Sequence, residues 1–442
     1  MHQILIHHRL HPYDRPSQSD HNPLSPGGHS RFRSEQEACT LLWRKLPTKL
    51  PFQFGRVAIM SSERNELMPS ESKLSNAPLE PKPSIVLNRT TSAGRSVACV
   101  IVTYGRREQL VRRTVAAVQS NQAVKRVIVV DNGCNRPVRA DDFATEPRVD
   151  VIRLDSNLGS AGGFHAGITA VQRLEDDDVG FVLILDDDNV GEDGFLERLL
   201  ALHTALGATD DIGLCALRRH RGIYPTLLAD QNAVAIRANS FLNFHLASLP
   251  SKLWRRFTRS GRPDQDNHGE LHLRRIETAP YGGLLLPMAA IRKVSPPNKD
   301  FVLYSDDHDY SLRLMDAGIT VYLTDVGCIN DAEESWDKPS TSARSALVSP
   351  DAPAWRLYYA CRNRILIEKR YTTSPIIYRI NRTSYVGLLA IEAILAYRSL
   401  SGARKALRPL LEAIADGDAQ RLGWRSEYQL PGASASNTAS VH

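Results

Sequence analysis

The sequence has no long apolar stretch. No run of about 18 apolar residues occurs among its 442 residues, so no membrane-spanning helix is predicted. The start, MHQILIHHRLHPYDRP, also lacks the sustained apolar core of a signal peptide. We therefore expect a cytoplasmic location, either free or peripheral on the inner face of the cell membrane.

Cysteine and net charge are both low. The six cysteines are scattered, and no two have the spacing of a metal site or a redox motif, so we expect reduced, buried thiols. The net charge of +6 is too small to indicate nucleic-acid binding by itself. It fits a nucleotide phosphate or an anionic membrane surface.

The composition changes along the chain, which predicts four regions. Residues 1–95 are rich in Pro, Ser, His and Arg with little periodicity, which indicates a disordered or loosely structured extension. Residues 96–345 have the pattern of an α/β domain. Residues 346–425 are predicted to be a helical C-terminal region, and residues 426–442 a disordered tail.

Buried strands and helices alternate in the α/β domain. Continuous apolar runs at 97–103, 126–130, 149–153 and 181–185 predict buried strands, and helical spacing over 106–119 and up to 174 predicts helices. This order predicts a mainly parallel sheet flanked by helices. Each strand ends in polar residues, and ligands bind at the carboxyl ends of such strands. We therefore expect one shared pocket.

Three consecutive aspartates, Asp186, Asp187 and Asp188, follow the fourth strand. Closely spaced like charges are costly unless a cation lies between them, and Mg²⁺ and Mn²⁺ prefer carboxylate oxygen. Because side chains alternate along an extended segment, Asp186 and Asp188 are expected to face the ligand and Asp187 to point away. The alternative is a solvated acidic turn that caps the next helix.

A glycine-rich loop, Asn157 to His165, lies between a strand and a helix. Its glycines, which allow a close approach of backbone to ligand, form neither GxGxxG nor GxxxxGK[ST]. The loop is therefore either one wall of a nucleotide pocket or only a turn and a helix start. The absence of GxGxxG after the first strand argues against a dinucleotide-dependent oxidoreductase.

A second acidic cluster, Asp306-Asp307-His308-Asp309, opens a predicted helix at 307–317. Carboxylates near a helix N-terminus are stabilised by the helix dipole, so capping explains the cluster. The alternative is that one carboxylate acts as general base for an acceptor hydroxyl.

The C-terminal region contains an apolar stretch, Tyr385–Tyr397, that is too short to span a bilayer and is surrounded by arginine and lysine. A helix in the membrane interface and a helix packed into the core both remain open. With the basic segment 252–275, this charge suggests a lipid-linked, diphosphate-bearing acceptor.

The order of these motifs resembles glycosyltransferase family 2 proteins with the GT-A fold, most closely bacterial galactofuranosyltransferase-like and rhamnosyltransferase-like members. The resemblance covers roughly residues 97–335. It rests on VIVTY (100–104), VVDN (129–132), NLGxAGG (157–163), LDDD (185–188) and SDDxDxxLR (305–313), and YYxxRN (358–363) is also similar.

The resemblance implies an inverting, metal-dependent transferase that uses Mg²⁺ or Mn²⁺ and a UDP- or dTDP-sugar, with galactofuranose favoured. The acceptor would be a glycan or a polyprenyl-diphosphate-linked glycan in cell-envelope polysaccharide synthesis, and no nucleic acid is expected. The implied site residues are Asp307 as catalytic base; Thr103, Tyr104, Arg106, Asp131, Asn132, Asn157, Gly159, Gly162, Gly163 and Asp187 for the donor; Asp186, Asp188 and Asp331 for the metal; and Asp306, Asp309, Gly282 and Gly283 for the acceptor.

One position departs from the family pattern. Members often carry a His after the strand that follows the base helix, and here Asp331 falls about there. A carboxylate also binds hard cations, so activity is compatible with this change. The alternatives are a rhamnosyltransferase that uses a dTDP-sugar, or a catalytically inactive nucleotide-sugar-binding relative.

Overall fold

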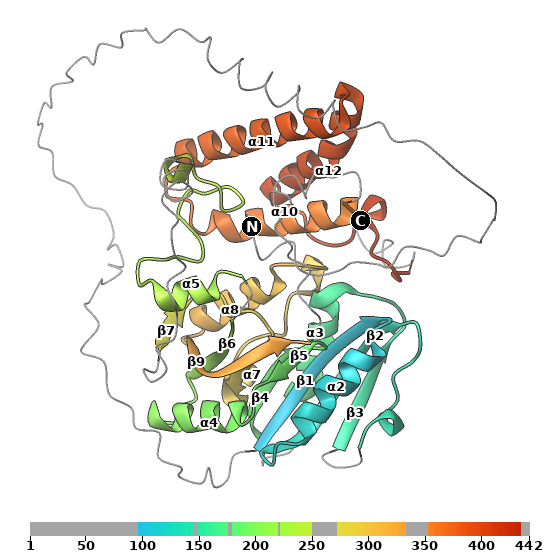
Figure 1. Cartoon of the computed structure of the whole chain (residues 1–442), viewed down its shortest axis with the longest axis vertical. Coiled ribbons are helices and arrows are strands. Elements are labelled where there is room, and N and C mark those ends of the chain that lie inside the picture. Colours follow the sequence, from blue (N-terminus) through green and yellow to red (C-terminus); the bar gives the residue numbers. More distant parts are fainter. Residues whose placement is uncertain are drawn as a thin grey trace, which may run out of the picture. The chain divides into compact units, whose positions relative to one another are not determined.

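The structure is a computed structural model that describes residues 96–144, 148–175, 179–219, 222–249, 272–332 and 352–434. The predicted extension over residues 1–95 and most of the basic segment 252–275 lie outside these ranges. Within them, the predicted fold class is confirmed: a central sheet is flanked by helices and followed by a helical C-terminal region (Figure 1).

One half of the sheet is parallel. Its strands lie in the order β3 (Arg148–Leu154), β2 (Val124–Cys134), β1 (Ser96–Gly105) and β4 (Val179–Asp186). These are the four strands predicted from apolar runs. Because all four run in the same direction, their carboxyl ends meet at one edge of the sheet.

The other half of the sheet is mixed. β8 (Leu284–Pro287) lies antiparallel between β4 and β6 (Ile212–Arg218), and β9 (Thr320–Asp331) runs parallel to β6. β5 (Asn189–Gly191) and β7 (Leu273–Ile276) both pair antiparallel with β9. This arrangement brings the ends of β6 and β9 close to the end of β4, although the three strands are far apart in sequence.

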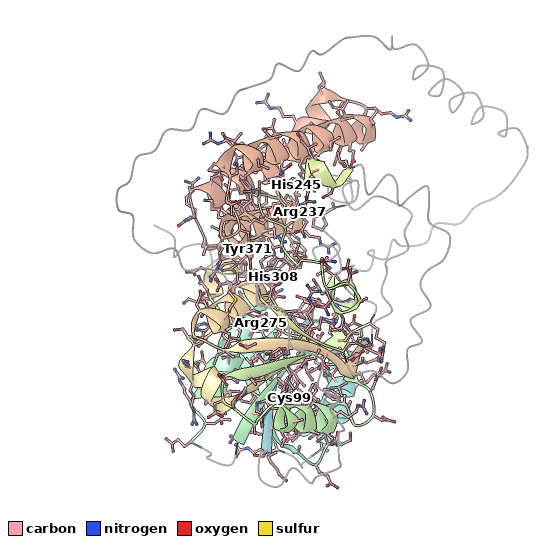
Figure 2. All side chains as sticks on the ribbon, turned by 90° about the vertical axis from the view of Figure 1, so that its left-hand side faces the viewer. Cys99, Arg237, His245, Arg275, His308 and Tyr371 are labelled. Carbon is pink, nitrogen blue, oxygen red and sulfur yellow. The ribbon has the colours of Figure 1, made fainter. Side chains whose placement is uncertain are left out.

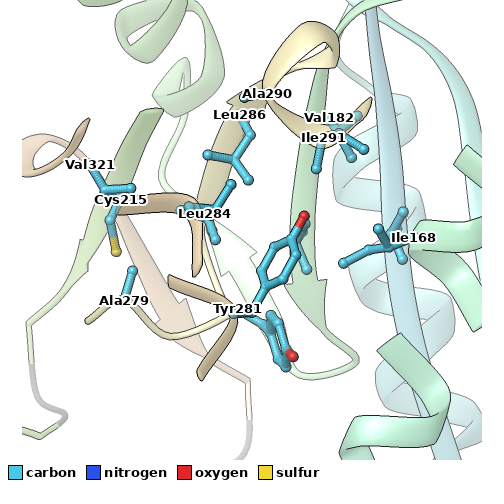
Figure 3. Packing of buried hydrophobic residues seen from close by; sticks show 14 of the residues in the cluster. Ile168, Val182, Cys215, Ala279, Tyr281, Leu284, Leu286, Ala290, Ile291 and Val321 are labelled. Carbon is cyan, nitrogen blue, oxygen red and sulfur yellow. The ribbon is translucent and has the colours of Figure 1, made fainter. Parts of the chain in front are cut away.

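Two cores cover the two faces of the sheet. Alternate residues of β1 face opposite sides, as the pleat requires, and every one of residues 96–103 is buried. The helices α2 (Glu108–Gln119) and α4 (Phe195–Ala205) pack on one face, and α3 (Gly159–Gln172) and α7 (Met288–Lys293) pack on the other. Figure 3 shows the second core, where Tyr281 lies among Ile168 of α3 and Leu284 of β8.

The C-terminal helices have a core of their own. α10 (Ala354–Lys369) packs against α12 (Leu400–Asp418), α12 packs against α11 (Pro375–Tyr397), and α10 also contacts α8 (Asp306–Asp316). The side chains of Ser374 and Ser399 cap the starts of α11 and α12. In the described part of the chain, no helix has both the length and the apolar character needed to cross a membrane.

The tail is shorter than the sequence predicted. Disorder was expected from residue 426, but Ser426–Tyr428 form a 3₁₀ helix, and Tyr428 and Leu430 are buried in the C-terminal core. Tyr428 stacks on Tyr358 of α10, with ring centroids 4.3 Å apart. Two buried apolar side chains, Tyr428 and Leu430, hold this segment against the C-terminal core. So short an apolar pattern does not distinguish a packed segment from a disordered tail in the sequence.

Candidate active site

The polar ends of β1, β2 and β4 lie side by side. The register pairs Thr103 of β1 with Asp131 of β2, and Val102 of β1 with Asp186 of β4. The first acidic cluster therefore starts beside Thr103. This juxtaposition follows from the parallel order of the strands, because each strand reaches the edge at the same height.

Arg107 holds two of the three consecutive aspartates. Its Nε lies 2.8 Å from Asp187 Oδ2, and its Nη2 lies 3.4 Å from Asp188 Oδ2. Thr103 Oγ1 donates to Asp187 over 2.8 Å, and Thr114 Oγ1 donates to the Asp187 carbonyl over 2.7 Å. Burial raises the pKa of Asp187 to about 7, and the guanidinium of Arg107 opposes that rise.

Arg218, at the end of β6, holds the third aspartate. Its Nη1 donates to Asp186 Oδ2 over 3.1 Å, and its Nη2 forms an ion pair with Asp331 at the end of β9. Asn189 joins the two groups, since its amide donates to Asp188 over 3.2 Å and to Asp331 over 3.1 Å. The Arg218 side chain is only 6% exposed, so its charge is largely withdrawn from water.

The expected alternation of the three aspartates is not what the structure shows. β4 ends at Asp186, and residues 187 and 188 lie in a turn, where the two-residue period of a strand no longer applies. The Asp188 side chain is 2% exposed and shares Arg107 with Asp187, whereas Asp186 is 24% exposed and shares Arg218 with Asp331. Asp186, rather than Asp188, is therefore the carboxylate of the three that reaches solvent.

Gly282, two residues before β8, packs directly against this cluster. A Cβ at Gly282 would lie 2.4 Å from Asn189 Oδ1 and 3.1 Å from Asp186 Oδ2. Gly283 has φ +91, and a Cβ there would lie 2.8 Å from Ile329. Both glycines thus make room for close packing at the site.

Two carboxylates of the second acidic cluster, Asp306 and Asp307 at the start of α8, have no basic partner among the described residues. Ser160 Oγ donates to Asp306 Oδ1 over 2.8 Å, and the buried Asp306 Oδ2 has no hydrogen-bond partner among the described residues. His308 N donates to Asp307 Oδ1 over 2.8 Å. No described Arg or Lys forms an ion pair with Asp306 or Asp307. Asp309 differs, because Arg313 Nε lies 2.9 Å from it, one helical turn further on.

This lack of counter-charge changes the protonation of both carboxyl groups. Burial raises the pKa of Asp306 to about 7. Burial also raises the pKa of Asp307 well above its usual range, and the charges of Asp306 and Asp186 add to that rise. Asp186 acts on both groups, so the two acidic clusters are electrostatically one site.

A strained loop precedes α8. Val302, Tyr304 and Ser305 all have positive φ, at 65, 70 and 59 degrees. Such angles cost a residue with a side chain about 1–2 kcal/mol each. The surrounding structure must therefore hold this loop, which aims the first turn of α8 and its carboxylates.

Two buried side chains of α10 supply that support. Asn363 Nδ2 donates to the carbonyls of Phe301 (2.8 Å), Leu303 (2.8 Å) and Tyr304 (2.9 Å). Arg362 donates to the carbonyls of Phe301 (3.0 Å), Asp300 (3.2 Å) and Gly423 (2.6 Å). Both side chains are 0% exposed. We call this pair the α10 clamp.

His308 adds a further link between α8 and α10. It lies at the boundary between the sheet and the C-terminal helices (Figure 2), and Arg364 Nη1 lies 3.4 Å from its Nδ1. Burial, with Arg364 nearby, lowers the pKa of His308 to about 3. A neutral imidazole therefore faces α10, and His308 cannot supply a counter-charge to the aspartates.

The glycine loop contacts the strained loop. Asn132 anchors it, donating to the Gly159 carbonyl over 2.9 Å and accepting from Leu158 N over 2.8 Å. Gly159 has φ +72, and a Cβ there would lie 1.9 Å from the Val302 carbonyl oxygen, so only glycine fits. Asn157 binds residues 431 and 432 of the tail through its amide and its backbone N–H.

The remaining glycines of this loop serve helix packing. A Cβ at Gly163 would lie 2.5 Å from Val102 of β1, and one at Gly162 would lie 2.5 Å from Leu158. These positions let α3 approach the sheet. The sequence predicted that this loop forms one wall of the site. Gly159 fits that prediction, because it borders the strained loop before α8, whereas Gly162 and Gly163 pack within the fold.

The other predicted donor residues are placed differently. Asp131 is fully buried and accepts from Cys134 N (2.7 Å) and Val138 N (3.0 Å), with an ion pair to Arg153. The Tyr104 ring lies under the Arg107 guanidinium, 5.4 Å from its centroid. Arg106 is exposed, and its neighbour Arg107 is the residue that reaches the aspartates.

Whether the site suits a divalent cation can be judged from charge. No three His, Cys, Asp or Glu side chains of the described ranges form a ready-made metal site. The charge of Asp186 nevertheless helps to raise the pKa of both Asp306 and Asp307, so the three carboxyl groups together lack positive charge. Carboxylate oxygens are the ligands that Mg²⁺ and Mn²⁺ prefer, and Asp186 is exposed to receive one. The donor set therefore fits a hard divalent cation.

Sequence reasoning missed three residues of the site, Arg107, Asn189 and Arg218. A weak signal existed for two of them, since each directly adjoins a motif: Arg107 follows the first strand and Asn189 follows the triple aspartate. Arg218 had no such signal. Arg218 reaches Asp186 because β8 lies between β4 and β6 in the sheet and so brings the ends of these two strands close together.

Comparison with known proteins finds a family match over part of the chain. Residues 98–223 match the family described as glycosyl transferase family 2. A search of curated proteins gives no match.

Solved structures resemble the chain only weakly. GalNAc-T7 with UDP, GalNAc and Mn²⁺ gives a TM-score of 0.40 at 11% identity, and the match covers 74% of this chain and 58% of that one. The mannosyltransferase PcManGT from Pyrobaculum calidifontis, with GDP-Man and Mn²⁺, gives 0.37 at 14% identity, covering 76% and 83%. TarS 1–349 of S. aureus gives 0.34 at 12% identity, covering 74% and 73%.

Proposed function

We propose that this chain, which carries a glycosyltransferase family 2 domain over residues 98–223, transfers a sugar from a nucleoside-diphosphate donor to a hydroxyl group with inversion. The observation that carries the proposal is the meeting of two unlike acidic clusters at one edge of the sheet. One is held by arginines, and the other consists of carboxyl groups with raised pKa. Donor binding and proton removal need these two environments.

The arginine-held cluster is the proposed donor side. Asp186, with Asp331 beside it, would hold Mg²⁺ or Mn²⁺, and Asp188 supports them through Asn189. When bound, the cation would offset charge that builds on the departing nucleoside diphosphate. Arg218 keeps Asp186 and Asp331 in place, and Arg107 does so for Asp187 and Asp188. Thr103, Asn132 and Gly159 line the same edge and are proposed to position the nucleoside.

Asp307 is the proposed general base. Its raised pKa means that the carboxylate, once ionised, takes a proton readily. It would take the proton of the acceptor hydroxyl as that oxygen attacks the anomeric carbon from the face opposite the leaving diphosphate. Asp306, which has one unpartnered oxygen, would accept a second hydrogen bond from the acceptor. Gly282, whose lack of a side chain lets its backbone pack against Asn189 and Asp186, is proposed to border the acceptor.

The donor and acceptor are proposed from the sequence resemblance and the charge. A UDP-sugar with galactofuranose is favoured over a dTDP-sugar, and the acceptor is a glycan or a polyprenyl-diphosphate-linked glycan of the cell envelope. The protein would act in the cytoplasm or at the inner face of the membrane.

A panel of UDP- and dTDP-sugars tests the proposal. Each is added with and without Mn²⁺, and the melting temperature and the release of nucleoside diphosphate are measured. We expect one donor to raise the melting temperature and to be slowly hydrolysed, only when Mn²⁺ is present. Donor binding without hydrolysis or transfer would identify an inactive relative instead, and no response to any nucleotide sugar would contradict the proposal.

A further inference from the structure

The exposed apolar side chains of the protein are concentrated in one place. Nine large hydrophobic residues are exposed in the described part of the chain, and eight of them belong to α11 and α12. Contiguous exposed apolar surface on a protein commonly marks an interaction site. The eight residues are Ile376, Ile377, Ile380, Ile391, Ile394, Leu395, Leu400 and Leu411. The ninth is Val234, outside both helices.

In α11 these residues share one face. At 100° per residue, the six exposed apolar positions fall within an arc of about 100°. The opposite side of the helix carries Tyr378, Tyr385 and Leu389, all buried in the C-terminal core. α11 is therefore apolar on two sides, and the described residues pack against only one of them. A Cβ at Gly387, in the middle of the outer arc, would meet nothing within 4 Å.

Positive charge surrounds this outer face. Residues 374–412 contain six arginines and lysines against two glutamates. Arg382 pairs with Asp418 and Arg408 pairs with Glu412. The other four, Arg379, Arg398, Arg404 and Lys405, are exposed, and none forms an ion pair with a described residue. Arg398 lies at the end of α11, and Arg404 and Lys405 lie near Leu400 on α12.

We propose that this outer face of α11, with the exposed start of α12, binds an anionic lipid bilayer and lies in its interface. Apolar side chains along one side of a helix enter the boundary between headgroups and acyl chains, and basic residues pair with anionic headgroups. A second copy of the chain fits less well, because pairing two such faces would bring four uncompensated positive charges on each copy together. Anionic headgroups neutralise the same charges.

The proposal bears on the reaction. α10 connects this surface to α8, since α10 contacts both α12 and α8. A bilayer bound at α11 would therefore be coupled through a rigid element to the turn that carries Asp307. Together with the proposed function, on which this step rests, the geometry favours an acceptor whose lipid anchor lies in that bilayer.

Vesicle sedimentation of the full chain tests the surface. The probes are vesicles of phosphatidylcholine alone and of phosphatidylcholine with an equal amount of phosphatidylglycerol. We expect binding to the anionic vesicles, at least tenfold weaker binding to the neutral ones, and loss of binding to anionic vesicles as salt is raised.

Matched variants locate the surface. Ile391→Asp with Leu395→Asp should weaken binding to anionic vesicles by tenfold or more, whereas Val234→Asp should leave it unchanged. Val234 is a suitable control because its 55% exposure is close to the 57% of Ile391. Arg404→Glu with Lys405→Glu should weaken binding several-fold without changing the melting temperature.

Three results would overturn the proposal: no vesicle binding by the wild type, equal binding by the Ile391/Leu395 variant, or a lipid-free dimer that this variant abolishes. The last would assign the face to a second copy of the chain. Turnover of a nucleotide sugar in the absence of vesicles is measured in parallel. It should be the same in all variants, so that failure at the membrane is distinguished from failure of the proposed function.

Discussion

The two acidic clusters at the edge of the sheet have the same residue type and opposite surroundings. Asp186, Asp187, Asp188 and Asp331 lie against Arg107 and Arg218. Asp306 and Asp307 lie against Ser160, backbone N–H groups and one another. In the first cluster fixed guanidinium groups lie against the carboxylates, and Arg107 opposes the rise that burial causes in the pKa of Asp187. The second has its pKa raised by burial and by like charge.

This difference assigns donor binding and proton transfer, the two tasks of the proposed reaction, to different clusters. Carboxylates fixed by arginines suit a cation and a diphosphate, whereas a carboxyl group with a raised pKa and no arginine beside it suits proton transfer near neutral pH. A count of aspartates in the sequence would treat the two clusters as equivalent. Their partners make them different: Arg218 at the end of β6 and Arg107 before α2 hold the first, and Ser160 of α3 binds the second. Variants that remove a partner, or the support of α10 for the loop before α8, test the division.

The largest effect is expected for Asp307. Asp307→Asn should lower kcat for transfer by at least about a thousandfold, because the amide cannot take the acceptor's proton. The melting temperature should not fall, since the change removes a repelling charge. Asp309→Asn is the matched control: Asp309 is paired with Arg313, and its loss should change kcat less than about tenfold. Turnover by Asp307→Asn near the wild-type rate would remove Asp307 from the mechanism.

Removing Arg218 should reveal what holds the first cluster. Arg218→Met leaves Asp186 and Asp331 without their shared cation, and breaking a buried ion pair costs about 3–5 kcal/mol. We expect a large fall in the free energy of unfolding in chelator, measured in urea. Mn²⁺ should recover part of it, because a divalent cation restores positive charge.

The neighbouring Arg219 provides the control for that experiment. Its side chain is 49% exposed and pairs with Glu192 at 3.4 Å, so Arg219→Met should change stability by less than about 1 kcal/mol. If Mn²⁺ stabilised Arg218→Met no more than the wild type, the cation would not bind where Arg218 acts.

The α10 clamp should matter for both stability and rate. Asn363→Ala leaves the carbonyls of Leu303 and Tyr304 without their donor, whereas Phe301 keeps Arg362, and this should cost about 2–4 kcal/mol. The loop then aims Asp307 less well, so kcat should fall roughly 10- to 100-fold while KM for the donor stays near its wild-type value.

Asn381→Ala separates positioning from stability. Asn381 is equally buried, donates to the Asn239 carbonyl over 2.8 Å and accepts from Leu246 N over 3.0 Å, far from α8. Its loss should destabilise the protein comparably and leave kcat unchanged. Equal falls in kcat for both variants would mean that the clamp acts on stability alone.

The smallest effect concerns pH. The pKa of Asp306 is raised from 3.8 to about 7, so its contribution to stability is full below about pH 4 and is lost as pH rises through 7. Asp306→Asn removes that loss. In chelator, the variant should gain stability over the wild type between pH 4 and pH 8, by up to about 1.4 kcal/mol for each unit by which the pKa is raised. Parallel curves of unfolding free energy against pH would show that Asp306 is not perturbed.

Much of the fold could be read from the sequence. The four parallel strands are continuous apolar runs, and their polar ends, from Thr103 to Asp186, meet as parallel topology requires. The helix at Asp306–Asp316 was predicted to within one residue at each end. These features are local, and local patterns determine them.

Features set by tertiary contacts could not be read in this way. Arg218 reaches Asp186 through the antiparallel insertion of β8, which has no local signature. Asp188 was expected to lie on the same side as Asp186, but it shares Arg107 with Asp187. The reason is that residues 187–188 form a turn, where the alternation of side chains along a strand stops. The left-handed residues before α8 and the packed segment 426–434 depend on α10, about 60 residues away from each. Their positions follow from contacts that no single segment specifies.

Donor binding by two variants tests the division between the clusters most directly. Mn²⁺-dependent binding of the donor found in the nucleotide-sugar panel is measured by calorimetry for the wild type, Asp186→Ala and Asp307→Asn. Asp307→Asn should bind with a Kd within about threefold of the wild type although it does not transfer, and Asp186→Ala should lose Mn²⁺-dependent binding. Equal loss of donor binding in both variants, or its retention in Asp186→Ala, would contradict the division.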